Sequence, residues 1–191
     1  MPDAPWNLFV QPDQRSCGAT VLVVAKLLAD PQYAAYVEGA DGLAARFRAE
    51  ALAMHQRVTG LADTSGRPQL PWPRAFGTPP WAVARQLGAT PAADGSHATY
   101  SWRLVRTSQS ASYDRLLAAA RTGRVSAVYL GSTWIPRHVV LVVDATPQGT
   151  LHVYDPAAGR LTELARAAYA GNHVGIAGWD VVWFDVTPSA P

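Results

Sequence analysis

The pattern of apolar and polar positions divides the chain into a helical first half and a strand-rich second half. Helical periodicity and helix stop signals predict helices over residues 17–29, 41–58, 78–87, 113–121 and 161–169. Runs rich in Val, Trp, Phe and Tyr predict strands over residues 100–106, 125–130, 137–143, 150–154 and 179–186. Residues 1–16 are expected to be extended, and 60–77 and 89–98 to be loops. The order predicts an α+β domain with a mainly antiparallel sheet, spanning residues 1–191 as a single unit.

The helix predicted over residues 17–29 is apolar on nearly every side. A helix of that kind is buried on all faces, so we expect it to be the central helix of the fold. It should end at Asp30-Pro31, because the residue before a proline leaves helical space. The one cysteine of the chain, Cys17, is then the first residue of this central helix.

Composition narrows the classes of function. Hydrophobic residues make up 49% and charged residues 16% of 191, which is typical of a globular protein. A net charge of +2 without a basic run gives no indication of nucleic-acid binding. The apolar runs have strand length, so no membrane insertion is expected. A single cysteine excludes an internal disulfide, no histidine pair has metal-ligand spacing, and no metal or organic cofactor is expected.

The first residues carry neither a positive segment nor an apolar segment of a signal peptide. Cytoplasmic localisation is therefore the default expectation. Export by a secretion system that uses no cleavable signal is the alternative.

Cys17 stands where a helix can activate a thiol. The positive end of a helix dipole favours a thiolate, which is the nucleophilic form of cysteine. The main-chain N–H of Cys17 is placed to donate to an oxyanion, and Gln11, six positions upstream, is a candidate for the second donor. The pattern therefore favours nucleophilic catalysis over the common alternative, a small buried hydrophobe.

His138 and Asp155 are candidates for the base and for the residue that orients it. His138 opens one apolar strand and Asp155 ends the next. If the two strands form a hairpin that turns near Pro147-Gln148-Gly149, the two residues lie opposite each other. Asp144 is the competing acceptor, but it lies at the far end of the His138 strand.

These residues together resemble the peptidase C39-like branch of the papain-like cysteine peptidases. That family carries a Gln, a Cys-Gly at the start of the central helix, a His opening an apolar strand, and an Asp in an Asp-Pro element. The matching residues in this chain are Gln11, Cys17-Gly18, His138 and Asp155-Pro156, and Gln14 also fits the bacteriocin-processing members. The resemblance covers residues 8–160. The chain departs from the pattern at Ser16, where the processing members usually have Asp.

The resemblance implies a papain-like fold and a cysteine hydrolase that acts on a peptide or protein amide bond. Cys17, His138, Asp155 and Gln11 would be catalytic, and Gly18 and Trp134 are predicted to contact the peptide or protein substrate. One alternative is a bacterial effector or toxin that uses the same residues as a deamidase or transglutaminase on a protein glutamine. The other is a binding module of this fold without catalysis.

The remaining histidines are weaker candidates. The segment around His173 resembles the His element of NlpC/P60 cell-wall hydrolases, whose nucleophile motif this chain lacks. His55, His97 and His152 are expected to be structural or exposed.

Overall fold

The computed structural model describes residues 4–39, 42–63, 66–92 and 94–189. The helices are α1 (Cys17–Ala29), α2 (Pro31–Glu38), α3 (Leu43–Val58), α4 (Pro80–Ala89), α5 (Gln109–Arg121) and α6 (Arg166–Ala170), with short 3-10 helices η1 (Trp6–Leu8) and η2 (Arg74–Phe76). The strands are β1 (Tyr100–Leu104), β2 (Ser126–Gly131), β3 (Pro136–Ala145), β4 (Leu151–Asp155), β5 (Arg160–Leu164) and β6 (Val181–Pro188).

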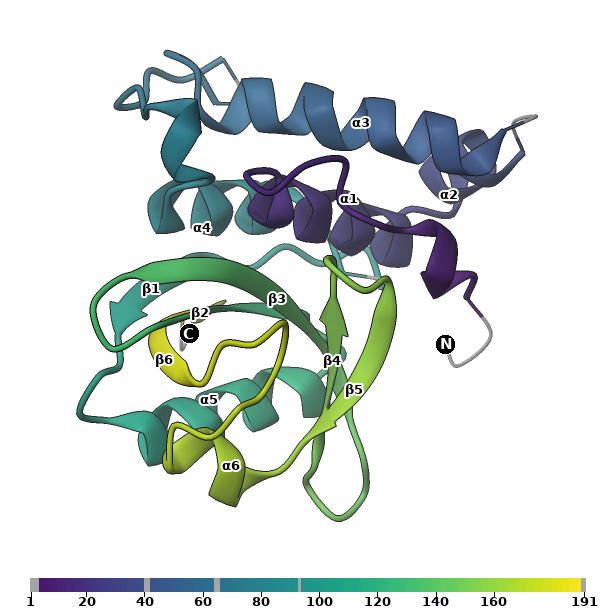
Figure 1. Cartoon of the computed structure of the whole chain (residues 1–191). Coiled ribbons are helices and arrows are strands. Elements are labelled where there is room, and N and C mark those ends of the chain that lie inside the picture. Colours follow the sequence, from purple (N-terminus) through teal and green to yellow (C-terminus); the bar gives the residue numbers. More distant parts are fainter. Residues whose placement is uncertain (1–3, 40–41, 64–65, 93, 190–191) are drawn as a thin grey trace.

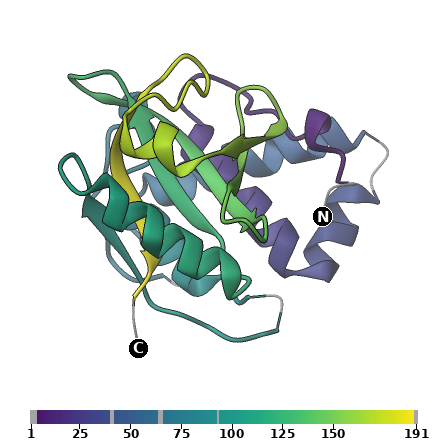
Figure 2. The ribbon, with the colours of Figure 1, turned by 90° about the horizontal axis from the view of Figure 1, so that it is seen from below.

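The six strands form one sheet in the order β1-β6-β2-β3-β4-β5, and every neighbouring pair is antiparallel. Helices α1 to α4 lie on one side of this sheet, and α5 and α6 lie on the other (Figure 1). Seen from below, α5 crosses the face of the sheet (Figure 2). The α+β class with an antiparallel sheet is therefore confirmed.

Each face of the sheet has its own hydrophobic core. Helix α1 packs between α3 and the sheet, and its buried side chains meet Val139 and Leu141 of β3. On the other face, Tyr113 and Leu116 of α5 pack with Val140 and Val142. The alternation of β3 between the two cores explains why this strand is apolar at consecutive positions. The prediction that α1 is a buried central helix is confirmed.

One helix was missed, and one predicted helix was wrong. Asp30 ends α1 as expected, but its carboxylate also accepts hydrogen bonds from the N–H groups of Gln32 and Tyr33, with Pro31 as the first residue of α2. A helix was therefore missed at 31–38. The helix expected over 161–169 is instead strand β5 followed by the short helix α6. The strand forms because Gly159 allows a tight turn that pairs β5 with β4.

Other boundaries differ by a few residues. Helix α4 continues through the predicted stop at Gly88 to Ala89, and α5 begins at Gln109, four residues early. The predicted helix start at Asp41, and parts of the predicted segments 1–16, 60–77 and 89–98, lie outside the described residues. Within the described part of the chain, no helix has both the length and the apolar character needed to cross a membrane.

The N-terminal segment is packed across β4 and the turn that follows it. The indole of Trp6 contacts the ring of Tyr154 in a tilted arrangement, with ring centroids 5.3 Å apart, and the Tyr154 hydroxyl donates to the Phe9 carbonyl. A Cβ on Gly159 would lie 2.7 Å from the Trp6 carbonyl oxygen, so only glycine fits there. The Gln11 N–H donates to the Pro156 carbonyl at 2.8 Å. These contacts bring Gln11 beside the Asp155-Pro156 element.

Candidate active site

His138 and Asp155 are in direct contact. Nε2 of His138 donates to Oδ1 of Asp155 at 2.8 Å, and the two side chains are only 5% and 1% exposed. Asp155 also accepts a hydrogen bond from the Ala157 N–H at 2.9 Å. The turn that follows β4 therefore fixes the Asp155 carboxylate, and this carboxylate fixes the orientation of the His138 imidazole.

The strand register that brings His138 and Asp155 together differs from the predicted one. The ladder pairs Ala145 with Leu151, so the turn is centred on residue 148, and a bulge between Val142 and Asp144 then shifts the pairing. The last pair is Leu141 with Tyr154, which places Asp155 beside Val140 rather than opposite His138. The two side chains still meet, because residues on a diagonal of neighbouring strands are within reach of long side chains.

Cys17 is the first residue of α1, and its side chain is buried. The preceding residue, Ser16, occupies the N-cap position but does not cap the helix with its side chain. Its hydroxyl instead donates to the Asp13 carbonyl at 3.2 Å and accepts from the Asp13 N–H at 3.3 Å. The first N–H groups of α1 are thus left without a side-chain acceptor from Ser16, so the end of the helix that carries Cys17 keeps its partial positive charge.

The charge of His138 links the three side chains. Burial by itself lowers the pKa of His138, but the hydrogen bond to Asp155 and the interaction with the Cys17 side chain outweigh burial and raise it to about 9. Burial raises the pKa of Asp155, but the hydrogen bonds from His138 and Ala157 bring it below its usual value. At neutral pH the pair is therefore an imidazolium and a carboxylate, with the imidazolium next to Cys17.

The Gln11 side chain is engaged locally. Its Nε2 donates to the Asp13 carbonyl at 2.9 Å, whereas its Oε1 is buried without a hydrogen-bond partner. Nε2 carries a second N–H, which is the candidate donor to an oxyanion at Cys17. The oxyanion role of Gln11 stays a prediction.

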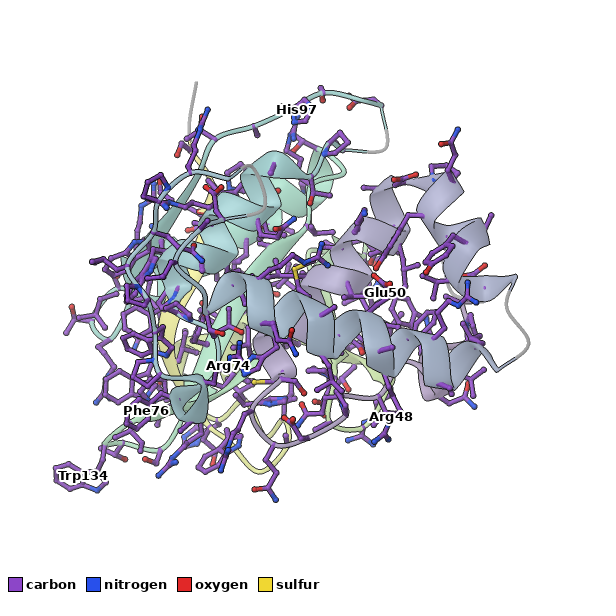
Figure 3. The ribbon with its side chains drawn as sticks, turned by 90° about the horizontal axis from the view of Figure 1, so that it is seen from above. Arg48, Glu50, Arg74, Phe76, His97 and Trp134 are labelled. Atoms are coloured by element: carbon purple, nitrogen blue, oxygen red, sulfur yellow. The ribbon has the colours of Figure 1, made fainter. Side chains whose placement is uncertain are left out.

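The two predicted substrate contacts lie in different surroundings. Gly18 is buried, and the Thr78 side chain packs directly on it. Trp134 is 84% exposed and projects outward from the edge of the molecule (Figure 3). The turn that carries it is well ordered by hydrogen bonds, because Ser132 Oγ accepts from the N–H groups of Trp134 and Ile135. Both substrate roles stay predictions.

The competing candidates are occupied or remote. Asp144 is hydrogen-bonded to His152, and His152 also lies 3.9 Å from Glu163, so Asp144 is engaged at the other end of β3. His173 is exposed in the turn after α6, and His97 is exposed near the Gly88 carbonyl. Over the described residues, no group of three or more His, Cys, Asp or Glu side chains is arranged to hold a metal ion.

Two residues near the site were missed from the sequence. Tyr129 of β2 is buried and close enough to Cys17 for a thiolate to affect the ionisation of its hydroxyl, which donates to the Thr78 carbonyl. Thr78 packs on Gly18. A tyrosine in an apolar strand has the pattern of an ordinary core residue, so the sequence carried no signal for this contact.

Comparisons with known proteins give a structural resemblance and no sequence match. No protein family model and no curated protein matches the chain. One solved structure that it resembles is the peptidase domain of Streptococcus ComA, described as a bi-functional ABC transporter involved in a quorum sensing pathway. The two share 14% sequence identity with a TM-score of 0.42, over 94% of this chain and 96% of that one. At this level of similarity, the function has to be inferred from the chain's own residues.

Proposed function

We propose that the chain is a papain-like cysteine hydrolase of the peptidase C39-like branch that acts on a peptide or protein amide bond. The observation that carries the proposal is the single chain of contacts from Asp155 through His138 to Cys17. A nucleophile, a base and a residue that orients the base are the three parts that covalent catalysis by a thiol needs.

In the proposed reaction, the proton is already on His138, Cys17 attacks as a thiolate beside this imidazolium, and Asp155 stabilises the imidazolium. Because Nε2 of His138 donates to Asp155, Nδ1 is the nitrogen left to exchange a proton with Cys17. The thiolate attacks the carbonyl carbon, and the oxyanion accepts hydrogen bonds from the Cys17 N–H and from Nε2 of Gln11.

The intermediate then collapses with loss of the amine, which takes its proton from His138. A water molecule, deprotonated by His138, hydrolyses the acyl-enzyme and releases the acid. In this proposal Gly18 and Trp134 contact the substrate, and Trp134 supplies an exposed aromatic surface four residues before His138. An aromatic side chain held out on an ordered turn is suited to contact an apolar group of a peptide.

The test uses p-nitrophenyl acetate, a small ester that acylates activated thiols. We expect a rapid release of p-nitrophenolate and an acetyl adduct on Cys17 by intact mass, followed by turnover. Cys17→Ala removes both, and His138→Ala slows acylation by about 100-fold. A fluorogenic peptide library on the same variants then identifies the amide substrate. Acylation of the wild type at the rate of a free thiol, unchanged in His138→Ala, would overturn the proposal.

A further inference from the structure

The start of α1 is in contact with a short segment that passes over it. We call residues 74–79, which comprise η2 and the three residues after it, the strap. A Cβ on Gly18 would lie 2.6 Å from the Cβ of Thr78, so the helix and the strap touch with no space for a side chain. Gly77 has a φ of 76°, a conformation that favours glycine, and it lies against the Arg15 carbonyl. The strap therefore passes against residues on both sides of Cys17.

One buried hydroxyl connects the strap to the sheet. Oη of Tyr129 donates to the Thr78 carbonyl at 2.8 Å. Tyr129 lies on β2 opposite Val139, and the next pair along the ladder is Leu130 with His138. Burial, with a smaller contribution from a charged Cys17, raises the pKa of Tyr129 well above its usual value, so the hydroxyl remains a donor.

The strap has few other polar contacts outside itself. Its main-chain hydrogen bonds are local. The Phe76 N–H donates to the Pro73 carbonyl and the Gly77 N–H donates to the Arg74 carbonyl. At the other end, the Pro79 carbonyl accepts from the N–H groups of Ala82 and Val83 in the first turn of α4. His55 of α3 lies near Arg74, at the opposite end of the strap. The Tyr129 hydroxyl is thus the contact, among those of the described residues, that ties the Thr78 end to the strands carrying the base.

We propose that Tyr129 is a positioning residue for the reaction inferred above, on which this inference rests. Its hydroxyl holds Thr78 against Gly18, and this contact fixes Cys17 relative to His138. Tyr129 would act by keeping the distance between the Cys17 thiol and the His138 imidazole fixed. If the strap moves away, the first turn of α1 loses its support and the thiol loses its alignment with the imidazole.

The test compares Tyr129→Phe with Tyr113→Phe. Tyr113 is also a buried tyrosine, on the other face of the sheet, and its hydroxyl lies 2.9 Å from both the Gly149 and the Leu164 carbonyl oxygens. The readouts are the rate of Cys17 alkylation by iodoacetamide across pH and the melting temperature. Both variants should melt earlier. Only Tyr129→Phe should alkylate more slowly near neutral pH, by about 3- to 10-fold, with its rate profile moved toward alkaline pH.

A second pair of variants tests the same contact from the helix side. Gly18→Ala should push Thr78 away and reproduce the alkaline movement of the profile, and adding Thr78→Gly, which removes the clashing Cβ, should restore it. A Tyr129→Phe profile identical to the wild type, with only the melting temperature lowered, would overturn this inference. If the wild type itself shows no dependence on His138, the proposed function fails instead, so the two failures are distinguishable.

Discussion

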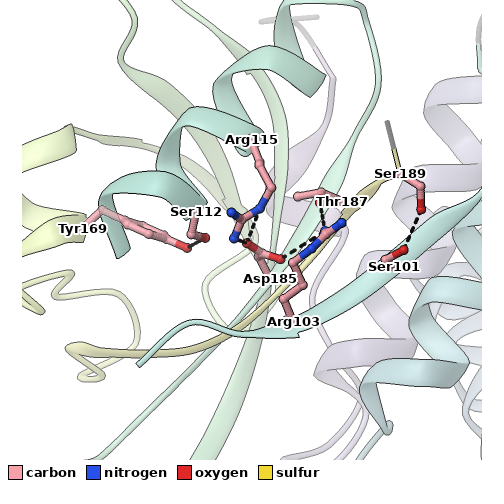
Figure 4. A network of polar contacts seen from close by, with 8 residues as sticks. All are labelled: Ser101, Arg103, Ser112, Arg115, Tyr169, Asp185, Thr187 and Ser189. Carbon is pink, nitrogen blue, oxygen red and sulfur yellow. Dashed lines mark hydrogen bonds and ion pairs between the residues drawn. The ribbon is translucent and has the colours of Figure 1, made fainter. Parts of the chain in front are cut away.

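Asp155 and Asp185 are both almost completely buried on the sheet, and they differ in the cation that faces each one. Asp155 is paired with His138, whose pKa of about 9 allows it to give up and take back a proton. Asp185 of β6 accepts from Nε of Arg115 at 3.2 Å and from Nη2 of the same group, and Nη1 of Arg103 lies 4.0 Å from its other oxygen. Figure 4 shows the two guanidinium groups approaching this carboxylate from α5 and from β1.

The difference separates a site that can do chemistry from one that holds elements together. Arginine does not lose its proton in proteins, so the Asp185 cluster has no group to act as a base. It fastens α5 and β1 to β6, with Arg103 also donating to Thr187 at 3.0 Å. The Asp155 cluster has a titratable ring and a thiol beside it. Burial of a carboxylate does not by itself indicate its function. The chemistry of the group paired with the carboxylate does.

The largest expected difference is in acylation. Asp155→Asn keeps the shape of the side chain but cannot stabilise an imidazolium, so acylation by p-nitrophenyl acetate should fall at least about 10-fold. Asp185→Asn should stay within about twofold of the wild type, because that cluster does not touch the reacting atoms. Equal losses in both variants, measured by p-nitrophenolate release, would erase the distinction between the two carboxylates.

Stability should show the role of the Asp185 cluster. Asp185→Asn removes the charge that faces two arginines, and we expect a loss of about 1–3 kcal/mol in the free energy of unfolding. Arg103 and Arg115 are partly exposed and can rehydrate, which limits the loss. Urea unfolding followed by circular dichroism measures it. An unfolding free energy unchanged by the substitution would mean that the cluster does not fasten the sheet.

The pH dependence of stability should differ between the clusters. The pKa of His138 is about 9 in the folded chain and 6.5 in the reference state, so its contribution is fully present below about pH 6.5 and is lost as pH rises through 9. The difference in unfolding free energy between the wild type and His138→Gln should therefore shrink between these limits. The corresponding difference for Asp185→Asn should stay constant over that range, since arginine remains charged. If the difference in unfolding free energy between the wild type and His138→Gln increased with pH, the pairing of His138 with Asp155 would be contradicted.

The smallest effect on folding is expected at Trp134. Its ring is exposed, so Trp134→Ala should change the unfolding free energy by no more than about 0.5 kcal/mol. If the ring contacts substrate, KM for a peptide identified in the library should rise while acylation by p-nitrophenyl acetate is unchanged. If KM for the peptide and the acylation rate were both unchanged, Trp134 would not be a substrate contact.

The sequence predicted the central helix and most strands because their signals are local. Cys17 to Ala29 has no polar face, and the five residues that follow His138 are all Val or Leu. The missed helix α2 and the misassigned strand β5 depend on less local features. Pro31 both ends one helix and begins the next, and β5 is specified by its turn and by pairing with β4 rather than by its own periodicity.

The sequence predicted which residues form the candidate site better than it predicted how they come into contact. Cys17, His138 and Asp155 stood out by their positions at element ends. Their contact depends on a bulge between Val142 and Asp144, and no sequence signal indicated that bulge. Tyr129 had no signal either, because its proximity to Cys17 arises from the packing of α1 on the sheet.

The most direct measurement of the central claim is the rate of Cys17 alkylation by iodoacetamide against pH, followed by intact mass, for the wild type and His138→Ala. Only the thiolate reacts, so the rate reports how much thiolate His138 and the start of α1 sustain. We predict that the wild type reacts at about pH 6 nearly as fast as at about pH 9, and that His138→Ala is about 100-fold slower at the lower pH. A wild-type thiol that reacts only under alkaline conditions, with the same profile in His138→Ala, would contradict the account and leave Cys17 as a core residue.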